Sequence, residues 1–172
     1  VVRLRVVEGR IGAVRTTGNR FFDQANILGS VPGLQPGQTP KLSAISRSIR
    51  LANDNPAKKI SLQLAPGANA SEVDATIEVT DQRPWTAGIT VDNTGDRQSG
   101  GARVGAFLSH ANLLNRDHLL TLQYVTSPQR PGGVRIYGLG YAAPLYGKGA
   151  SVDLVAAYSD VNSGSVAAAS MA

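Results

Sequence analysis

The second half of the sequence alternates apolar residues with small or polar ones, and this pattern constrains the fold more than any other feature. From Trp85 onward, no segment keeps the spacing of three or four residues between apolar positions that predicts a helix. Because successive side chains of a strand point to opposite faces, each alternating segment predicts one strand with one apolar face. The five predicted strands cover residues 85–91, 102–110, 120–124, 136–142 and 151–158.

The connections between the predicted strands alternate in length. Those at 92–100 and 126–133 are long, whereas those at 115–117 and 144–149 are shorter. Long loops on one side and short turns on the other are typical of up-and-down barrels in bacterial outer membranes. A soluble β-sandwich shows the same alternation with its apolar face turned inward, so periodicity alone leaves both architectures open. The glycine-rich opposite face of the fourth strand favours a wide, water-filled lumen.

Aromatic residues are concentrated in the same part of the chain. The single Trp and all five Tyr lie at or after residue 85. Aromatic side chains near strand ends form girdles at the two interfaces of a membrane barrel. The predicted membrane-interface residues, which we expect to contact outer-membrane lipid, are Trp85, Tyr124, Tyr137, Tyr141 and Tyr158.

Residues 1–81 mix strand and helix patterns, which predicts an α+β fold. Alternation and β-branched residues predict strands at 1–8, 11–15, 59–64 and 72–79. Two helices are expected between the second and third of these strands. From residue 9 onward the predicted order is therefore strand, helix, helix, strand, strand.

The two helices carry recognisable start and stop signals. Asp23 is expected to cap a short helix over 23–28, with Gly29 after its last turn. Thr39 and Pro40 predict the cap and the first residue of a longer helix, since proline is well tolerated at that first position. The run from Asn53 to Pro56 is expected to end it.

The net charge of +5 raises the question of a nucleic-acid partner. Residues 1–80 hold ten Lys and Arg against six Asp and Glu, so most of the excess lies there. These cations are scattered singly and have no aromatic or glycine-rich RNA-binding pattern among them, so no nucleic acid is expected as a partner. The concentration of charge before residue 81 and of aromatic residues after it predicts a domain boundary at this point.

No motif in the sequence predicts an enzyme. Cysteine is absent and there are only two histidines, which excludes a thiol nucleophile and any metal site rich in Cys or His. Gly138–Ala143 fits the dinucleotide-binding pattern, but its glycines fall inside a predicted strand and Pro144 follows at once. Asp92–Asp96 lacks the glutamate of a calcium loop and is typical of a hairpin turn. We expect no catalytic residues, no metal and no cofactor.

Five segments follow, in order, the motifs of one protein family. The segments are Val1–Gly9, Leu51–Gly67, Asp92–Gly95, Asn112–Asp117 and Tyr141–Gly147. The first segment is similar to the end of a POTRA domain of that family, and the second to its "LN…P…L.PG" segment. The third, fourth and fifth are similar to its turn motifs "DN.G", "NLL..GD" and "Y..PL..G".

On these segments the chain resembles the two-partner secretion transporters (TpsB, haemolysin secretion/activation type), which belong to the POTRA-plus-barrel superfamily of outer-membrane proteins. Arg116 stands where this family usually has glycine. The family's plug helix and its Arg-Gly-Tyr-type loop motif are not in this sequence, and the five predicted strands are too few to close a barrel of the family. The resemblance therefore describes a fragment of a longer transporter.

The resemblance implies a domain order and a location. Residues 1–8 would end a preceding POTRA domain, 9–81 would form a POTRA domain in the periplasm, and 82–172 would form the first antiparallel strands of a transmembrane β-barrel. The protein would reside in the bacterial outer membrane and export a secreted partner exoprotein, without a cofactor. Two other functions stay open: an insertase of the same superfamily, and a soluble two-domain binding protein with a β-sandwich.

A free sheet edge would let a POTRA domain capture an unfolded partner by strand addition, because the edge offers unpaired main-chain hydrogen-bonding groups. The candidate edge is the strand over 59–64, beside the short helix 23–28; plain core packing is the alternative role for these residues. The candidate partner-binding residues are Lys59, Ile60, Ser61, Leu62, Gln63 and Leu64.

Overall fold

The structure, a computed structural model, describes residues 9–69 and 71–162, so the predicted strand over 1–8 lies outside the described residues. The described chain forms two compact units. The first comprises the residues up to Pro84 together with Ala111–Leu119 and Ala142–Asp153. The second comprises Trp85–His110, Leu120–Tyr141 and the residues from Leu154 onward.

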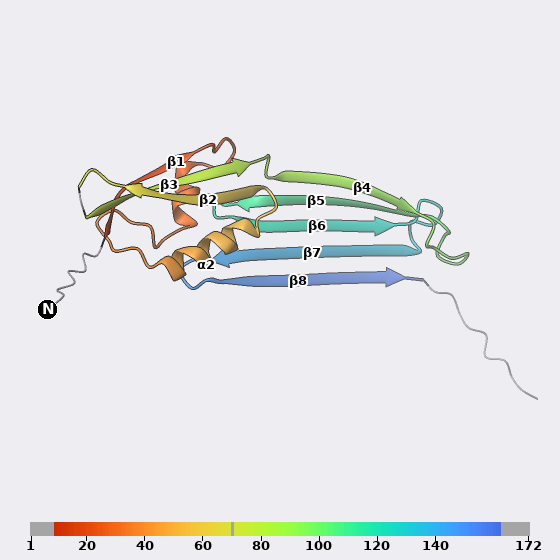
Figure 1. The fold of residues 1–172 in the computed structure, drawn as a ribbon. Helices are drawn as coiled ribbons and strands as arrows, with labels where there is room; N and C mark the ends of the chain where they lie inside the picture. The colour runs from red at the N-terminus through yellow and green to blue at the C-terminus, as the bar shows by residue number, and fades with distance from the viewer. Residues whose placement is uncertain (1–8, 70, 163–172) are drawn as a thin grey trace, which may run out of the picture. The chain divides into compact units, whose positions relative to one another are not determined.

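The first unit contains a three-stranded sheet and two helices (Figure 1). The elements follow the predicted order of strand, helix, helix, strand, strand. The central strand β3 pairs in parallel with β1 and antiparallel with β2, so that β1 and β2 form the two edges. The elements are β1 (Arg10–Thr17), α1 (Gln24–Gly29), α2 (Leu42–Asn53), β2 (Lys58–Pro66) and β3 (Glu72–Asp81).

The core of the first unit lies between one face of this sheet and the helices. Alternation along β2 and β3 turns one set of side chains to this face, where Ile60 and Ile77 are buried, and turns the residues between them outward. Apolar residues of α1 and α2 complete the core at a helical spacing. The buried apolar residues contributed by the helices are Ile27, Ile45 and Ala52.

Helix α1 begins as the sequence predicts. The Asp23 carboxylate accepts a hydrogen bond from the Asn26 backbone N–H at 2.7 Å and so satisfies one of the free donors of the first turn. The same carboxylate accepts a bond from the Asn115 side chain at 2.8 Å. These bonds, chiefly the one from Asn115, hold the pKa of Asp23 below its usual value. Gly29, expected just after the helix, is its last residue.

Helix α2 begins later than predicted. Its first residue is Leu42 and its N-cap is Lys41, which makes no capping bond, so the cap expected at Thr39 is wrong. The cause is a long-range contact. The Gly37 N–H donates to the Ile11 carbonyl at 2.7 Å and the Ile11 N–H donates to the Gln38 carbonyl at 2.9 Å. This pairing keeps the chain beside β1 up to the residues before Pro40, so the helix starts only after the proline.

Asp81, the last residue of β3, anchors the loop that follows β1. Its carboxylate accepts bonds from the backbone N–H groups of Arg20, Phe21 and Phe22 at 2.8–2.9 Å. Burial of the carboxylate opposes ionisation, but the three N–H donors outweigh it and lower the pKa of Asp81. The loop thereby places Phe22, which is 1% exposed, in the core.

We expect acid to release this loop. Because the pKa of Asp81 is lowered in the folded state, its stabilisation is complete above its ordinary pKa of about 4 and is lost as the pH falls through the folded value. Hydrogen-exchange protection of the three amides, corrected for intrinsic rates, should stay constant from pH 7 down to about pH 4 and fall below it. In Asp81→Asn the protection should already be lower at pH 7 and change less. Equal protection in both proteins at every pH would contradict the anchor.

The second sheet has five strands in chain order, and their arrows alternate in direction in Figure 1. All five predicted strands are confirmed, and most extend further than the alternation indicated. The register between the first two runs from Trp85 opposite His110 to Asp92 opposite Arg103. The strands are β4 (Trp85–Asp92), β5 (Arg103–Leu113), β6 (His118–Thr126), β7 (Val134–Leu145) and β8 (Ala150–Val161).

One face of this sheet is apolar and uncovered within the described residues of the second unit. Ile89 is 76% exposed and Leu154 is 61% exposed, both on that face. A sandwich would bury these side chains beneath a second sheet, whereas the described residues of this unit form a single sheet. The opposite face carries mainly small and polar side chains, such as Ser109 and Thr121, whose hydroxyl oxygens lie 3.2 Å apart, together with Phe107 and Val155. None of the helices described here is long and apolar enough to cross a membrane.

Candidate functional site

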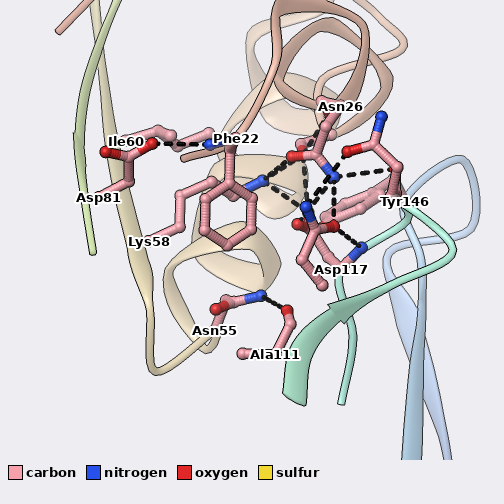
Figure 2. A network of polar contacts seen from close by, with 12 residues as sticks. Phe22, Asn26, Asn55, Lys58, Ile60, Asp81, Ala111, Asp117 and Tyr146 are labelled. Atoms are coloured by element: carbon pink, nitrogen blue, oxygen red, sulfur yellow. Dashed lines mark hydrogen bonds and ion pairs between the residues drawn. The ribbon is translucent and has the colours of Figure 1, made fainter. Parts of the chain in front are cut away.

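A buried lysine lies at the centre of an extensive polar network in the first unit. Lys58 is the first residue of β2. It lies two residues before Ile60, so its side chain points to the same core face, and it is 0% exposed. Its ammonium donates to Asp117 Oδ2 at 2.6 Å, to Asn26 Oδ1 at 2.8 Å and to Ser30 Oγ at 2.8 Å. These three acceptors use all three of its N–H groups (Figure 2).

The Asp117 carboxylate, 1% exposed, is equally well satisfied. Besides the bond from Lys58, it accepts the Tyr146 hydroxyl proton at 2.5 Å and an Asn26 amide proton at 3.0 Å, and Ser30 Oγ lies 2.9 Å away. Burying a carboxylate and an ammonium costs several kcal/mol each in free energy, and only close geometry and further hydrogen bonds compensate for it. Both conditions are met here.

Burial changes the acid–base properties of two members of the network. Desolvation lowers the pKa of Lys58, and the Asp117 carboxylate opposes this shift. Desolvation and the same carboxylate raise the pKa of Tyr146 far above its usual value. Tyr146 therefore stays protonated and serves as a hydrogen-bond donor to Asp117 over the whole physiological pH range.

The turn between β5 and β6 supplies the carboxylate in a strained backbone. Leu114, Asn115 and Asp117 have φ values of 58°, 57° and 61°. This left-handed conformation costs roughly 1–2 kcal/mol for an ordinary L-residue and less for Asn and Asp. Asn26 bonds the Asn115 carbonyl at 3.1 Å and the Asn112 side chain at 3.1 Å, which fixes the turn in this shape.

Further contacts within the same unit join its helical segments to the end of β5 and to the turn between β7 and β8. Asn55, just after α2, donates to the Ala111 carbonyl at 2.7 Å. Ser48 Oγ donates to the Tyr146 carbonyl at 3.3 Å, and Arg47 lies against Gly149 in the turn between β7 and β8. The network thus links α1, α2 and β2 with both turns.

The predicted partner-binding strand is an edge strand, as the proposal of strand addition requires. Lys59, Ser61 and Gln63 are exposed on the sheet face opposite the helices, whereas Ile60 is buried and Leu62 packs against the core. Leu64 is 43% exposed. The expected neighbour was the short helix 23–28, but the helix that borders this edge is α2, and α1 reaches β2 at Lys58.

Part of this edge is already occupied by a side chain. The Ile60 N–H donates to Asn53 Oδ1 at 2.7 Å, and Asn53 Nδ2 donates to the Ile60 carbonyl at 3.0 Å. Both main-chain groups of Ile60 therefore point away from β3. Because backbone direction alternates along a strand, Leu62 and Leu64 point the same way, and Ser61 and Gln63 point toward β3. The open stretch of the edge is at Leu62 and Leu64.

The predicted interface aromatics lie at two levels of the second unit. Tyr124, Tyr137 and Tyr158 form a row across β6, β7 and β8, with ring centroids 4.9 Å and 6.2 Å apart. Trp85 begins β4, at the opposite end of the strands, and its ring meets His110 edge-on at 4.3 Å. Tyr141 follows Tyr137 on the same strand face, four residues nearer to that end.

Lys58, Asp117 and Tyr146 were not identified from the sequence. The alternation along β2 could have indicated that Lys58 is buried, since Lys58 lies on the same strand face as Ile60 and Leu62. Its partner lies 59 residues further along the chain, and no local pattern links the two. The described residues contain no group of three or more His, Cys, Asp or Glu side chains arranged to hold a metal.

Comparison with known proteins gives a family and a fold. Residues 71–163, more than half of the chain, match the profile of the family "Haemolysin secretion/activation protein ShlB/FhaC/HecB". No curated protein sequence matches.

Among solved structures, the chain is similar to CdiB from Escherichia coli, with a TM-score of 0.64 and 22% identity over 80% of this chain and 26% of that one. It is also similar to BamA from Haemophilus ducreyi lacking POTRA domains 1–3, with a TM-score of 0.56 and 18% identity over 89% and 28%. For CdiB from Acinetobacter baumannii, the TM-score is 0.53 and the identity is 11%, over 79% of this chain and 26% of that one. The chain spans about a quarter of the length of these proteins.

Proposed function

Because the chain belongs to the haemolysin secretion/activation family ShlB/FhaC/HecB, we propose that it is part of an outer-membrane transporter that exports a partner exoprotein by two-partner secretion. The observation that carries this proposal is the family match across β3 and the whole five-stranded sheet. The likeness of the fold to CdiB supports it.

Within this proposal, residues 9–81 are a POTRA domain in the periplasm and residues 82–172 are the first strands of the barrel. The strand–helix–helix–strand–strand order and the β1–β3–β2 sheet support the first assignment. The uncovered apolar face and the two levels of aromatic residues support the second, since lipid-facing strands carry an apolar band between aromatic girdles. The domain boundaries stay a prediction.

A comparison of the proteins in the culture medium, with and without the transporter, tests the proposed function and does not require that the partner be known. Deleting the gene for the full-length protein should remove one large protein from the medium while the outer-membrane barrels keep their abundance. A general loss of barrels from the outer membrane would instead favour the alternative function, an insertase of the same superfamily. No change in either fraction would contradict both.

The POTRA domain would capture the unfolded partner by adding a strand to β2, and the open stretch at Leu62 and Leu64 makes this testable. Leu64→Pro removes an outward-pointing N–H from the edge and leaves the pairing with β3 in place. We expect it to lower secretion of the partner several-fold. Leu64→Ala is the matched control, because it removes the same exposed side chain but keeps the N–H. Equal secretion by the two variants would reject this edge.

A further inference from the structure

The short turns of the five-stranded sheet belong to the compact unit of the helices and the three-stranded sheet. Ala111–Leu119 and Ala142–Asp153 group with the residues up to Pro84, and the strand segments between them group separately. The contacts responsible come from three elements: α1 with its C-cap (Asn26 and Ser30), α2 (Ser48) and β2 (Lys58). The turns are therefore docked on the part of this unit formed by α1, α2 and the three-stranded sheet (residues 9–84), which we call the helical module.

The chemistry of this docking selects one arrangement. An apolar contact surface can slide by an ångström at little cost, but a buried ion pair cannot, because any displacement leaves a charge without a partner. Lys58 uses every donor it has, and Asp117 receives protons from three different segments. Replacing both charges by apolar residues would keep the surface buried but would lose this selectivity.

The turn itself is shaped for docking. Three of its residues have positive φ, and its tip residue Leu114 is 72% exposed, so neither local preference nor burial of the tip accounts for the conformation. The bonds from Asn26 to Asn115 and Asp117, and from Asn115 back to Asp23, account for it. Strained backbone that is held by surrounding contacts is characteristic of functional positions.

We propose that Lys58, Asp117 and Tyr146 are positioning residues for export, which keep the helical module docked on the turns β5–β6 and β7–β8 while the partner passes. The inference rests on the proposed function. It requires that export proceed with the module docked, and that the module lose its fixed position when the ion pair is removed.

A disulfide between α2 and the turn β7–β8 tests whether export needs the docked state. A Cβ atom placed on Gly149 would lie 3.5 Å from the Cβ of Arg47, which is within the range for a disulfide. In full-length Arg47→Cys/Gly149→Cys, we expect the bond to form and secretion to be the same, within twofold, with and without reductant. The two single-cysteine variants are the controls.

Two results of this experiment would overturn the proposal. Gly149 has a φ of 64°, so a cysteine there carries backbone strain, which the Gly149→Cys single variant measures. If that variant assembles and exports normally but the disulfide of the double variant does not form under oxidising conditions, the turn and the helix are not docked. If the oxidised protein exports at least tenfold less than the reduced one, the module must leave the turns during export. Formation of the disulfide does not depend on export, so it also separates failure of this inference from failure of the proposed function.

The same disulfide tests the role of Lys58. We expect Lys58→Met to lower export at least tenfold, with the amount of folded protein in the outer membrane unchanged within twofold. Adding the oxidised Arg47→Cys/Gly149→Cys pair should restore export, because the covalent link replaces the lost docking. Normal export by Lys58→Met, or failure of the disulfide to restore it, would show that Lys58 is not a positioning residue.

Discussion

Asp117→Ala is expected to destabilise the first unit by about 3–5 kcal/mol, the usual cost of leaving one member of a buried ion pair without its partner. Lys58 has no exposed surface through which water could take the place of the carboxylate. Tyr146 would lose its acceptor at the same time. Alanine is also less tolerant than aspartate of the positive φ at this position, which adds to the loss.

Native-state hydrogen exchange on the full-length protein measures this effect locally. Amides of α1 and of the start of β2 should exchange roughly a hundred to several thousand times faster in Asp117→Ala, since each 1.4 kcal/mol corresponds to a factor of ten. Exchange in the middle of the five-stranded sheet should change much less. A uniform change across the whole chain would argue against a local network.

The double variant Lys58→Met/Asp117→Ala separates the charge from the packing. Because Met fills most of the lysine's volume and carries no charge, the double variant should be clearly more stable than Asp117→Ala alone. The two substitutions should therefore show a coupling free energy on the order of 2 kcal/mol. Additive effects would mean that Asp117 and Lys58 contribute independently, and the ion pair would then have no special role.

The sequence predicts the elements of this chain better than it predicts their long-range contacts. Alternation specifies β4 to β8 because the side-chain period of a strand is a local property. Asp23 and its bond to Asn26 are three residues apart, so the start of α1 is local as well. Each of these features could be predicted because the residues that determine it are close together in the chain.

The features that the sequence did not predict depend on distant partners. The start of α2 is set by two bonds with Ile11 of β1: the Gly37 N–H donates to its carbonyl, and its N–H donates to the Gln38 carbonyl. Lys58 is the first residue of a strand, a position where a lysine is usually solvated, and its burial depends on its distant acceptors Asp117, Asn26 and Ser30. The closed part of the β2 edge depends in the same way on Asn53, which belongs to α2.

Leu122→Arg is expected to prevent assembly in the outer membrane. Leu122 lies in the middle of β6, on the apolar face beside the row of tyrosines, and is 43% exposed. If this face contacts lipid, an arginine near the midplane costs about 2–4 kcal/mol. Folded full-length protein, measured as the heat-modifiable form in outer-membrane fractions, should fall at least tenfold.

Gln123→Arg is the matched control, because the next residue of the strand points to the opposite face. Its neighbour there is Gly138 of β7, so an arginine has room and meets no lipid in a barrel whose lumen holds water. We expect Gln123→Arg to assemble as well as the unaltered protein. Equal loss of both variants would mean that neither face is a lumen, and equal tolerance would mean that the apolar face is not embedded in lipid. Only the combination of a sensitive Leu122 and a tolerant Gln123 fits a strand with one face in the membrane and the other in water.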